Sequence, residues 1–140
     1  APLGAFCSKE FCSVSEPGDH GSTFGGNALT TSAGAAAAEF MVKNNIPNMA
    51  LESGKYMFEK LSELMKKFNF ITEVRGMGLL IGLEMNKDLS GEIVGKALEK
   101  GLLINAVRPN MIRFMPPLNV SKDEIDQAVK VIDEILEESK

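Results

Sequence analysis

The stretch Ile71–Met85, ITEVRGMGLLIGLEM, decides how the second half of this chain folds. Two extended segments stand around Gly76 and Gly78, and the second of them is a nearly continuous apolar run. Short apolar runs that glycine punctuates are typical of neighbouring strands joined by a turn. The sequence therefore predicts two strands here, and the segments on both sides show what covers them.

A long amphipathic helix is predicted before these strands and a short helix after them. Ser90–Lys100 has a helical pattern, and Gly101 follows it at the position where glycine favours helix termination. The longer helix is indicated by apolar residues that recur at helical spacing, with lysines and glutamates between them. These residues are Leu51, Met57, Phe58, Leu61, Leu64, Met65 and Phe68.

Two more strands and a capped helix complete the second half. The segments 102–107 (LLINAV) and 111–116 (MIRFMP) read as strands, and Arg108-Pro109-Asn110 between them is turn chemistry. Ser121 and Glu124 form an S-x-x-E capping box at the start of the last helix. The order helix, two strands, helix, two strands, helix predicts an α+β domain in which helices cover one face of a short, mainly antiparallel sheet.

The first part of the chain has a different character. Leu3–Cys7 is a candidate for a short buried strand, and a helix is predicted over Ala28–Val42 with Asn27 as its N-cap. Asn44-Asn45 and Pro47 interrupt that helical pattern. We therefore expect a domain boundary here, with one part over residues 1–46 and the other over residues 47–140.

Composition excludes several classes of function. The chain has 140 residues and a net charge of -4, which argues against a nucleic-acid-binding surface. It has no apolar run of the ~20 residues that a membrane-spanning helix needs. Cys7 and Cys12 cannot make a disulfide framework, so we expect a cytoplasmic protein whose thiols are buried or inert. His20 is the only histidine and is interpreted as a surface residue, so no metal site is predicted.

The segment 20–27, HGSTFGGN, is the first candidate site. Its glycines let the backbone approach a ligand or another chain, and Ser22 and Thr23 offer hydroxyl groups just before a predicted helix. Loops of this kind bind phosphate. The pattern matches neither a Walker A loop nor a dinucleotide fingerprint. Taken alone, it is equally compatible with a tight crossing between domains.

Arg113 is the second candidate. It lies between Ile112 and Phe114, and strand alternation puts it on the opposite face from both. A guanidinium group matches a carboxylate with two parallel hydrogen bonds, so a carboxylate site is one interpretation. A solvent-facing arginine or an internal salt bridge is the other. Arg75 and Arg108 lie at glycine or turn positions and are interpreted as structural.

Three motifs together resemble one enzyme family. GDHGSTFGGN (18–27), VRGMGLLIGLE (74–84) and IRFMPPL (112–118) are similar, in this order, to motifs of class-III, fold-type-I pyridoxal-phosphate aminotransferases. The resemblance extends from Ala1 to Lys140. Within the class, the segment 101–118 is most similar to the acetylornithine aminotransferases, and the ornithine aminotransferases come next.

The resemblance implies roles for the candidate residues. Ser22 and Thr23 would bind the phosphate of pyridoxal 5′-phosphate in the neighbouring subunit of a homodimer, through a Gly21–Asn27 loop that acts in trans. Arg113 would bind a substrate carboxylate. The implied reaction transfers the amino group of N-acetylornithine to 2-oxoglutarate in arginine biosynthesis. Ornithine, 4-aminobutyrate and succinylornithine transaminases, or a non-catalytic α+β interaction module, stay open as alternatives.

The resemblance also predicts that this chain is the C-terminal third of an enzyme. The family binds its cofactor through a Schiff-base lysine in K-x-L-G-G-G-x-P-[IL]-G-A, of which Ala1–Ala5 matches only the end. The lysine is expected upstream of Ala1, so these residues contain no catalytic group and should be inactive alone. Residues 1–46 would then be the end of the cofactor-binding large domain and 47–140 the small domain. One departure is Ala28, where the family usually has a proline that pre-organises the helix start.

Overall fold

The computed structural model describes residues 2–139 and divides into two compact units, Ala1–Asn45 and Ile46–Lys140. The first unit contains a 3₁₀ turn, η1 (Glu10–Cys12), and one helix, α1 (Ala28–Lys43). The strand predicted over Leu3–Cys7 is wrong, since this segment has no partner strand to pair with. No residue between 2 and 45 is buried. Cys7 and Cys12 are accordingly exposed free thiols, so the expected burial is wrong too.

Helix α1 begins where its sequence predicts. The side chain of Asn27 accepts a hydrogen bond from the backbone N–H of Thr30 at 3.1 Å, which satisfies one of the unpaired donors at the helix start. The helix is 16 residues long and carries Lys43 in its last turn, where a positive charge is favourable. Asn27 is therefore an N-cap, and it ties the glycine-rich loop to the first turn of α1.

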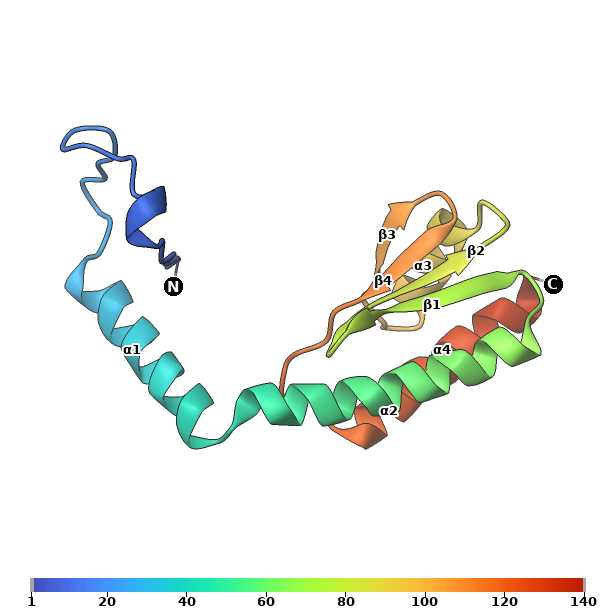
Figure 1. Ribbon diagram of the computed structural model, residues 1–140. Coiled ribbons are helices and arrows are strands. Elements are labelled where there is room, and N and C mark those ends of the chain that lie inside the picture. Colours follow the sequence, from blue (N-terminus) through green and yellow to red (C-terminus); the bar gives the residue numbers. More distant parts are fainter. Residues whose placement is uncertain (1, 140) are drawn as a thin grey trace. The chain divides into compact units, whose positions relative to one another are not determined.

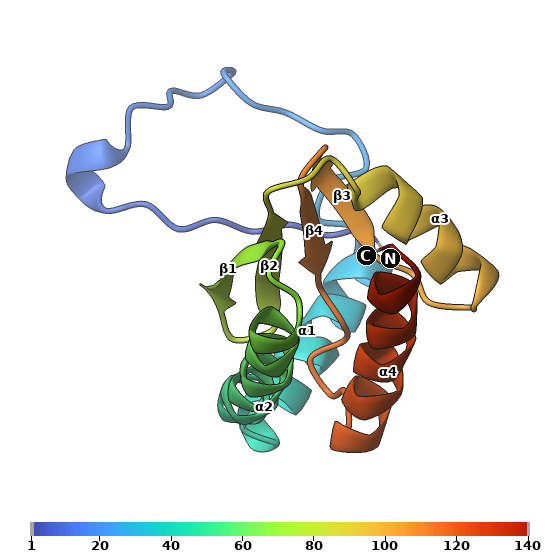
Figure 2. The same cartoon turned by 90° about the vertical axis from the view of Figure 1, so that its right-hand side faces the viewer.

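The second unit is built on a four-stranded antiparallel sheet (Figures 1 and 2). The strand order is β1-β2-β4-β3, so the two hairpins lie side by side through β2 and β4. This confirms the predicted α+β fold with a small antiparallel sheet. The elements are α2 (Ile46–Lys67), β1 (Ile71–Met77), β2 (Leu80–Met85), α3 (Ser90–Glu99), β3 (Asn105–Arg108), β4 (Met111–Phe114) and α4 (Lys122–Glu138). Among residues 2–139, none of the helices combines the length and the apolar character that crossing a membrane requires.

The core lies between one face of the sheet and the helices. Register pairs Ile81 with Phe114 and Leu83 with Ile112, and all four side chains are buried on the same face. Helices α2 and α3 pack against the sheet, and α4 packs against both of these helices and runs beside α2 (Figure 2). Because side chains alternate along a strand, the other face of the sheet carries the polar residues. That face holds the second candidate site.

Two glycines allow α2 to approach the turn between β1 and β2. Gly78 has φ +54°, the left-handed region that favours glycine. A Cβ atom at Gly54 would overlap the carbonyl group of Gly78, so helix and turn touch backbone to backbone. This contact fixes where along α2 the turn between β1 and β2 packs.

Polar contacts join the outer sides of α2 and α4. Tyr56 donates its O–H to the carboxylate of Asp126, with distances of 2.8 and 2.9 Å to the two oxygens. The ammonium groups of Lys60 and Lys122 lie 5.4 and 5.1 Å from the centre of the Tyr56 ring. The hydrogen bond to Asp126 raises the pKa of Tyr56, because it stabilises the protonated phenol.

We expect Gly54→Ala to destabilise the second unit by about 1–3 kcal/mol, because the new methyl group has only rigid backbone to displace. Gly95→Ala is the matched control in helix α3, since a Cβ there meets nothing within 4 Å. The control should raise the free energy of unfolding by about 0.5–1 kcal/mol through helix propensity. Urea denaturation followed by circular dichroism measures both. Equal effects of the two substitutions would contradict the close contact.

The alkaline titration of Tyr56 tests the contact between α2 and α4. Because the chain has one tyrosine and no tryptophan, its tyrosinate absorbance reports this residue alone. The pKa should lie above the usual 10.0 and fall toward that value in Asp126→Asn. The raised pKa means that the contribution of this hydrogen bond to stability is complete below pH 10.0 and is lost as the pH rises through the folded-state pKa. Asp133→Asn, which removes a partner of Lys67 instead, should leave the titration unchanged.

Candidate functional site

Arg113 lies on the sheet face opposite the helices, as its sequence context predicts. Its neighbours Ile112 and Phe114 are buried in the core, whereas Arg113 is half-buried. Directly across from it are Gly82 on β2 and Asn105 on β3. Gly82 has no side chain, and the Met111 methyl group occupies the space that a Cβ atom there would take.

The hydrogen bonding of Arg113 is incomplete. Its Nη2 donates to Oδ1 of Asn105 at 3.4 Å, and its Nε is buried without a hydrogen-bond partner. No carboxylate of residues 2–139 forms an ion pair with it, so the internal salt bridge considered from the sequence is not formed. A buried charged donor without a partner is costly, and a bound anion is one group that would satisfy it. The guanidinium group is therefore free to bind an anion.

Arg75, in contrast, has its charge satisfied within the sheet. Its Nη1 contacts the carboxylate of Glu73 and lies 2.6 Å from Oε2 of Glu84. These hydrogen bonds raise the pKa of Arg75, with Glu84 the larger cause. Arg108 is exposed beside the turn, and its carbonyl accepts a hydrogen bond from the Ser90 hydroxyl at 2.6 Å. Among the three arginines, Arg113 is the one whose surroundings fit a carboxylate ligand.

The glycine-rich loop is organised by its own side chains. Ser22 Oγ accepts a hydrogen bond from the N–H of Gly25 at 3.0 Å. Gly26 adopts φ +66°, and the Asn27 amide donates to the carbonyl of Phe24 at 2.9 Å. The loop is thus closed on itself and held at the N-terminus of α1.

Both hydroxyl groups of this loop fit a phosphate ligand. Neither Ser22 nor Thr23 donates its O–H to any acceptor within residues 2–139, and both side chains are exposed. They stand just before α1, whose free N–H groups and positive dipole end favour an anion. His20 is exposed as expected. In the part of the chain that the structure describes, no group of three His, Cys, Asp or Glu side chains could hold a metal ion.

Gly82 and Asn105 are site residues that sequence reasoning misses. Neither carries a motif of its own, and their place beside Arg113 depends on how β2, β4 and β3 are aligned. Strand register over four residues is not readable from local propensity. The only signal is the position of Asn105 within the segment 102–107, whose other residues are apolar.

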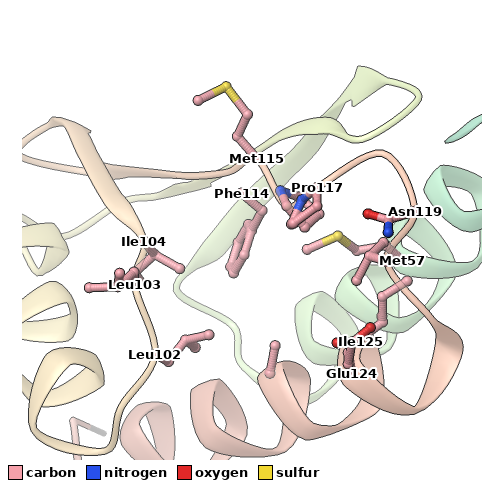
Figure 3. Close-up of a pocket in the computed structure, with 13 residues that line it drawn as sticks. Met57, Leu102, Leu103, Ile104, Phe114, Met115, Pro117, Asn119, Glu124 and Ile125 are labelled. Carbon is pink, nitrogen blue, oxygen red and sulfur yellow. The ribbon is translucent and has the colours of Figure 1, made fainter. Parts of the chain in front are cut away.

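A separate cavity of about 420 Å³ lies in the second unit, on the helix side of the sheet (Figure 3). Phe114 points into it, from between the segment Leu102–Ile104 and helices α2 and α4 (Figure 3). Its lining is mainly apolar, with Asn119 and Glu124 at one side. Because Glu124 already serves the capping box with Ser121, the cavity offers little polar chemistry. Arg113 does not line it, so cavity and arginine are distinct features.

Comparison with known proteins defines the fold first. An acetylornithine aminotransferase structure from Elizabethkingia anophelis superposes with a TM-score of 0.80 at 31% identity, covering 88% of this chain and 33% of that one. The fold is thus that of part of a fold-type-I aminotransferase. The family model for class-III aminotransferases matches residues 2–136, and the chain belongs to this family.

Relatives with assigned names agree with the family. An acetylornithine aminotransferase of Caldanaerobacter subterraneus subsp. tengcongensis is 47% identical over 98% of this chain, and an ornithine aminotransferase of Oceanobacillus iheyensis is 43% identical over 96%. The chain spans 35% and 33% of the lengths of these two relatives. Class-III aminotransferases depend on pyridoxal phosphate.

Proposed function

We propose that this chain is the C-terminal third of an aminotransferase that transfers the amino group of N-acetylornithine to 2-oxoglutarate in arginine biosynthesis. The relatives named acetylornithine aminotransferase support this substrate, and the unpaired guanidinium group of Arg113 carries the argument from structure. In this proposal residues 1–46 end the cofactor-binding large domain and residues 47–140 form the small domain. Residues 1–140 alone should be inactive, since the activity belongs to a longer polypeptide.

Arg113 would bind the α-carboxylate that acetylornithine and 2-oxoglutarate share. Its buried Nε has no other acceptor, and Nη2 makes only a long hydrogen bond to Asn105. A carboxylate that accepts from two guanidinium nitrogens would satisfy these donors and fix its own orientation.

Ser22 and Thr23 would donate hydrogen bonds from their hydroxyl groups to the phosphate group of pyridoxal 5′-phosphate. When bound, this cofactor supplies the electron sink for moving the amino group. The loop contributes fixed donors and the positive end of the α1 dipole, which anchor the phosphate. The residues described here thus bind and orient, and the Schiff-base lysine would lie outside them.

We further propose that the enzyme is a cytoplasmic homodimer and that the Gly21–Asn27 loop serves the partner's active site. Three glycines flank Ser22, Thr23 and Phe24, more than one close approach to a ligand needs. A backbone pressed against both a ligand and a second chain would need this freedom. The exposure of the whole loop within its own unit is compatible with such a contact.

An ornithine aminotransferase is the second candidate, favoured by the Oceanobacillus iheyensis relative at 43% identity. Arg113 cannot distinguish the two donors, because both carry the same α-carboxylate. Steady-state kinetics of the full-length enzyme with a panel of amines, including 4-aminobutyrate and succinylornithine, decides the donor. Absence of transamination with every donor would leave the non-catalytic interaction module.

Arg113→Ala in the full-length enzyme should lower kcat/KM about ten- to several-hundred-fold for both acetylornithine and 2-oxoglutarate. The reason is the loss of a charge-assisted bidentate hydrogen bond, worth roughly 1.5–3 kcal/mol or more. Arg113→Lys should retain only part of the activity, because an ammonium group cannot offer two parallel N–H donors to one carboxylate. Arg108→Ala is the control and should stay within twofold. A value within twofold for Arg113→Ala would show that this arginine is structural.

Subunit complementation tests the loop. A Thr23→Ala variant is mixed with a variant whose Schiff-base lysine is replaced, under conditions in which subunits exchange. If the loop acts in trans, mixed dimers contain one site with both the lysine and Thr23, and activity should reappear there. Mixing two samples of the same variant is the control and should restore nothing. Exchange without recovery of activity would show that Thr23 acts in cis or has no role.

A further inference from the structure

Two arginines and one carboxylate are neighbours on the face of the sheet that the helices leave uncovered. Arg75 on β1 and Arg113 on β4 both lie directly across from Gly82, one on each side of β2. Glu84 is two residues further along β2 and therefore on the same face. It is a diagonal neighbour of both arginines, at a spacing that long charged side chains can bridge.

The structure shows which arginine holds the carboxylate. Glu84 Oε2 lies 2.6 Å from Nη1 of Arg75, and no carboxylate within residues 2–139 pairs with Arg113. Glu73, the other partner of Arg75, lies directly across from Glu84 on β1 and so one strand further from Arg113. Within residues 2–139, Glu84 is therefore the acidic residue whose strand position is diagonal to Arg113, and its carboxylate is engaged by Arg75 and, at 3.5 Å, by the side-chain amide of Asn110.

Met111 blocks the remaining route between Glu84 and Arg113. Glu84 pairs with Met111, and Gly82 pairs with Arg113. The four residues therefore occupy the corners of a quadrilateral on two neighbouring strands. A Cβ atom at Gly82 would overlap the Met111 methyl group, so the methionine side chain lies along the diagonal from Met111 to Gly82. This diagonal crosses the one from Glu84 to Arg113. The Arg75 Nη2 contacts the Met111 sulfur at 3.6 Å, which holds the side chain in place.

We propose that Arg75 is a positioning residue that keeps Arg113 available for substrate by holding Glu84, with Met111 over Gly82 as the barrier between them. The inference rests on the proposed role of Arg113 in carboxylate binding. Without Arg75, the Glu84 carboxylate would turn to the unpaired guanidinium group of Arg113. A substrate carboxylate would then have to displace an internal one, which raises KM and leaves the chemical step unchanged.

The test compares variants of the full-length enzyme. Arg75→Met should raise the KM for both acetylornithine and 2-oxoglutarate about three- to fivefold, the upper end expected for competition by an exposed ion pair, with kcat within twofold. Adding Glu84→Gln should return KM to within twofold of the wild type. Adding Glu73→Gln instead is the matched control and should not. Arg75→Lys retains the charge and should keep KM near the wild-type value.

Met111→Ala provides a second route to the same answer if Arg75→Met does not fold. Removing the barrier should raise KM, and Glu84→Gln should remove that increase. Maleate is a dicarboxylate with no transferable group, so its affinity can be measured by calorimetry without turnover. The variants that raise KM should weaken maleate binding, and Glu84→Gln should restore it. The proposal is overturned if Glu84→Gln restores neither KM nor maleate affinity in the Arg75 and Met111 variants.

Failure of this inference is distinguishable from failure of the proposed function. If Arg113→Ala impairs both substrates but Glu84→Gln rescues nothing, the role of Arg75 is wrong while Arg113 remains the carboxylate site. If Arg113→Ala leaves KM and maleate binding unchanged, the proposed carboxylate site is itself wrong.

Discussion

The burial of one face of the sheet is the constraint on which the rest of the second unit depends. Ile81 and Leu83 on β2 meet Phe114 and Ile112 on β4, and the helices close over these four side chains. Because strands alternate, this burial puts Arg113 and its neighbours on the opposite face with no further instruction. A shift of register by one residue would move Arg113 into the apolar core, where an unpaired charge is prohibitive. Core packing and the position of Arg113 are thus specified together.

Much of this architecture is predictable because its signals are local. The capping box of Ser121 and Glu124, the amphipathic stripe of α2 and the turn at Pro109 each lie within a few neighbouring residues. The face of Arg113 follows from its two apolar neighbours. The roles of Ser22, Thr23 and Arg113 in binding remain predictions, since the geometry shows free donors and no ligand.

What escapes prediction is what depends on a distant segment. Leu3–Cys7 has the composition of a strand, but a strand exists only through its partner, and residues 2–45 contain none. Gly54 in a helix contacts Gly78 in a turn, and no local sequence pattern predicts that these two glycines meet. Likewise, Arg75 beside a glycine looks structural until the register places Glu84 between two arginines.

The two units differ in how many buried side chains stabilise them. Residues from Ile46 onward supply every buried side chain of the core, so the carboxylate-binding candidate Arg113 rests on a domain with its own source of stability. In the unit that carries Ser22 and Thr23, none of residues 2–45 is buried, and Phe6 and Val42 are more than four-fifths exposed, at 88% and 82%. Exposed apolar side chains of this kind contribute nothing to the stability of the unit, because the hydrophobic effect acts only on surface that is removed from water. The trans role proposed for the glycine-rich loop would place this exposed unit against a second chain.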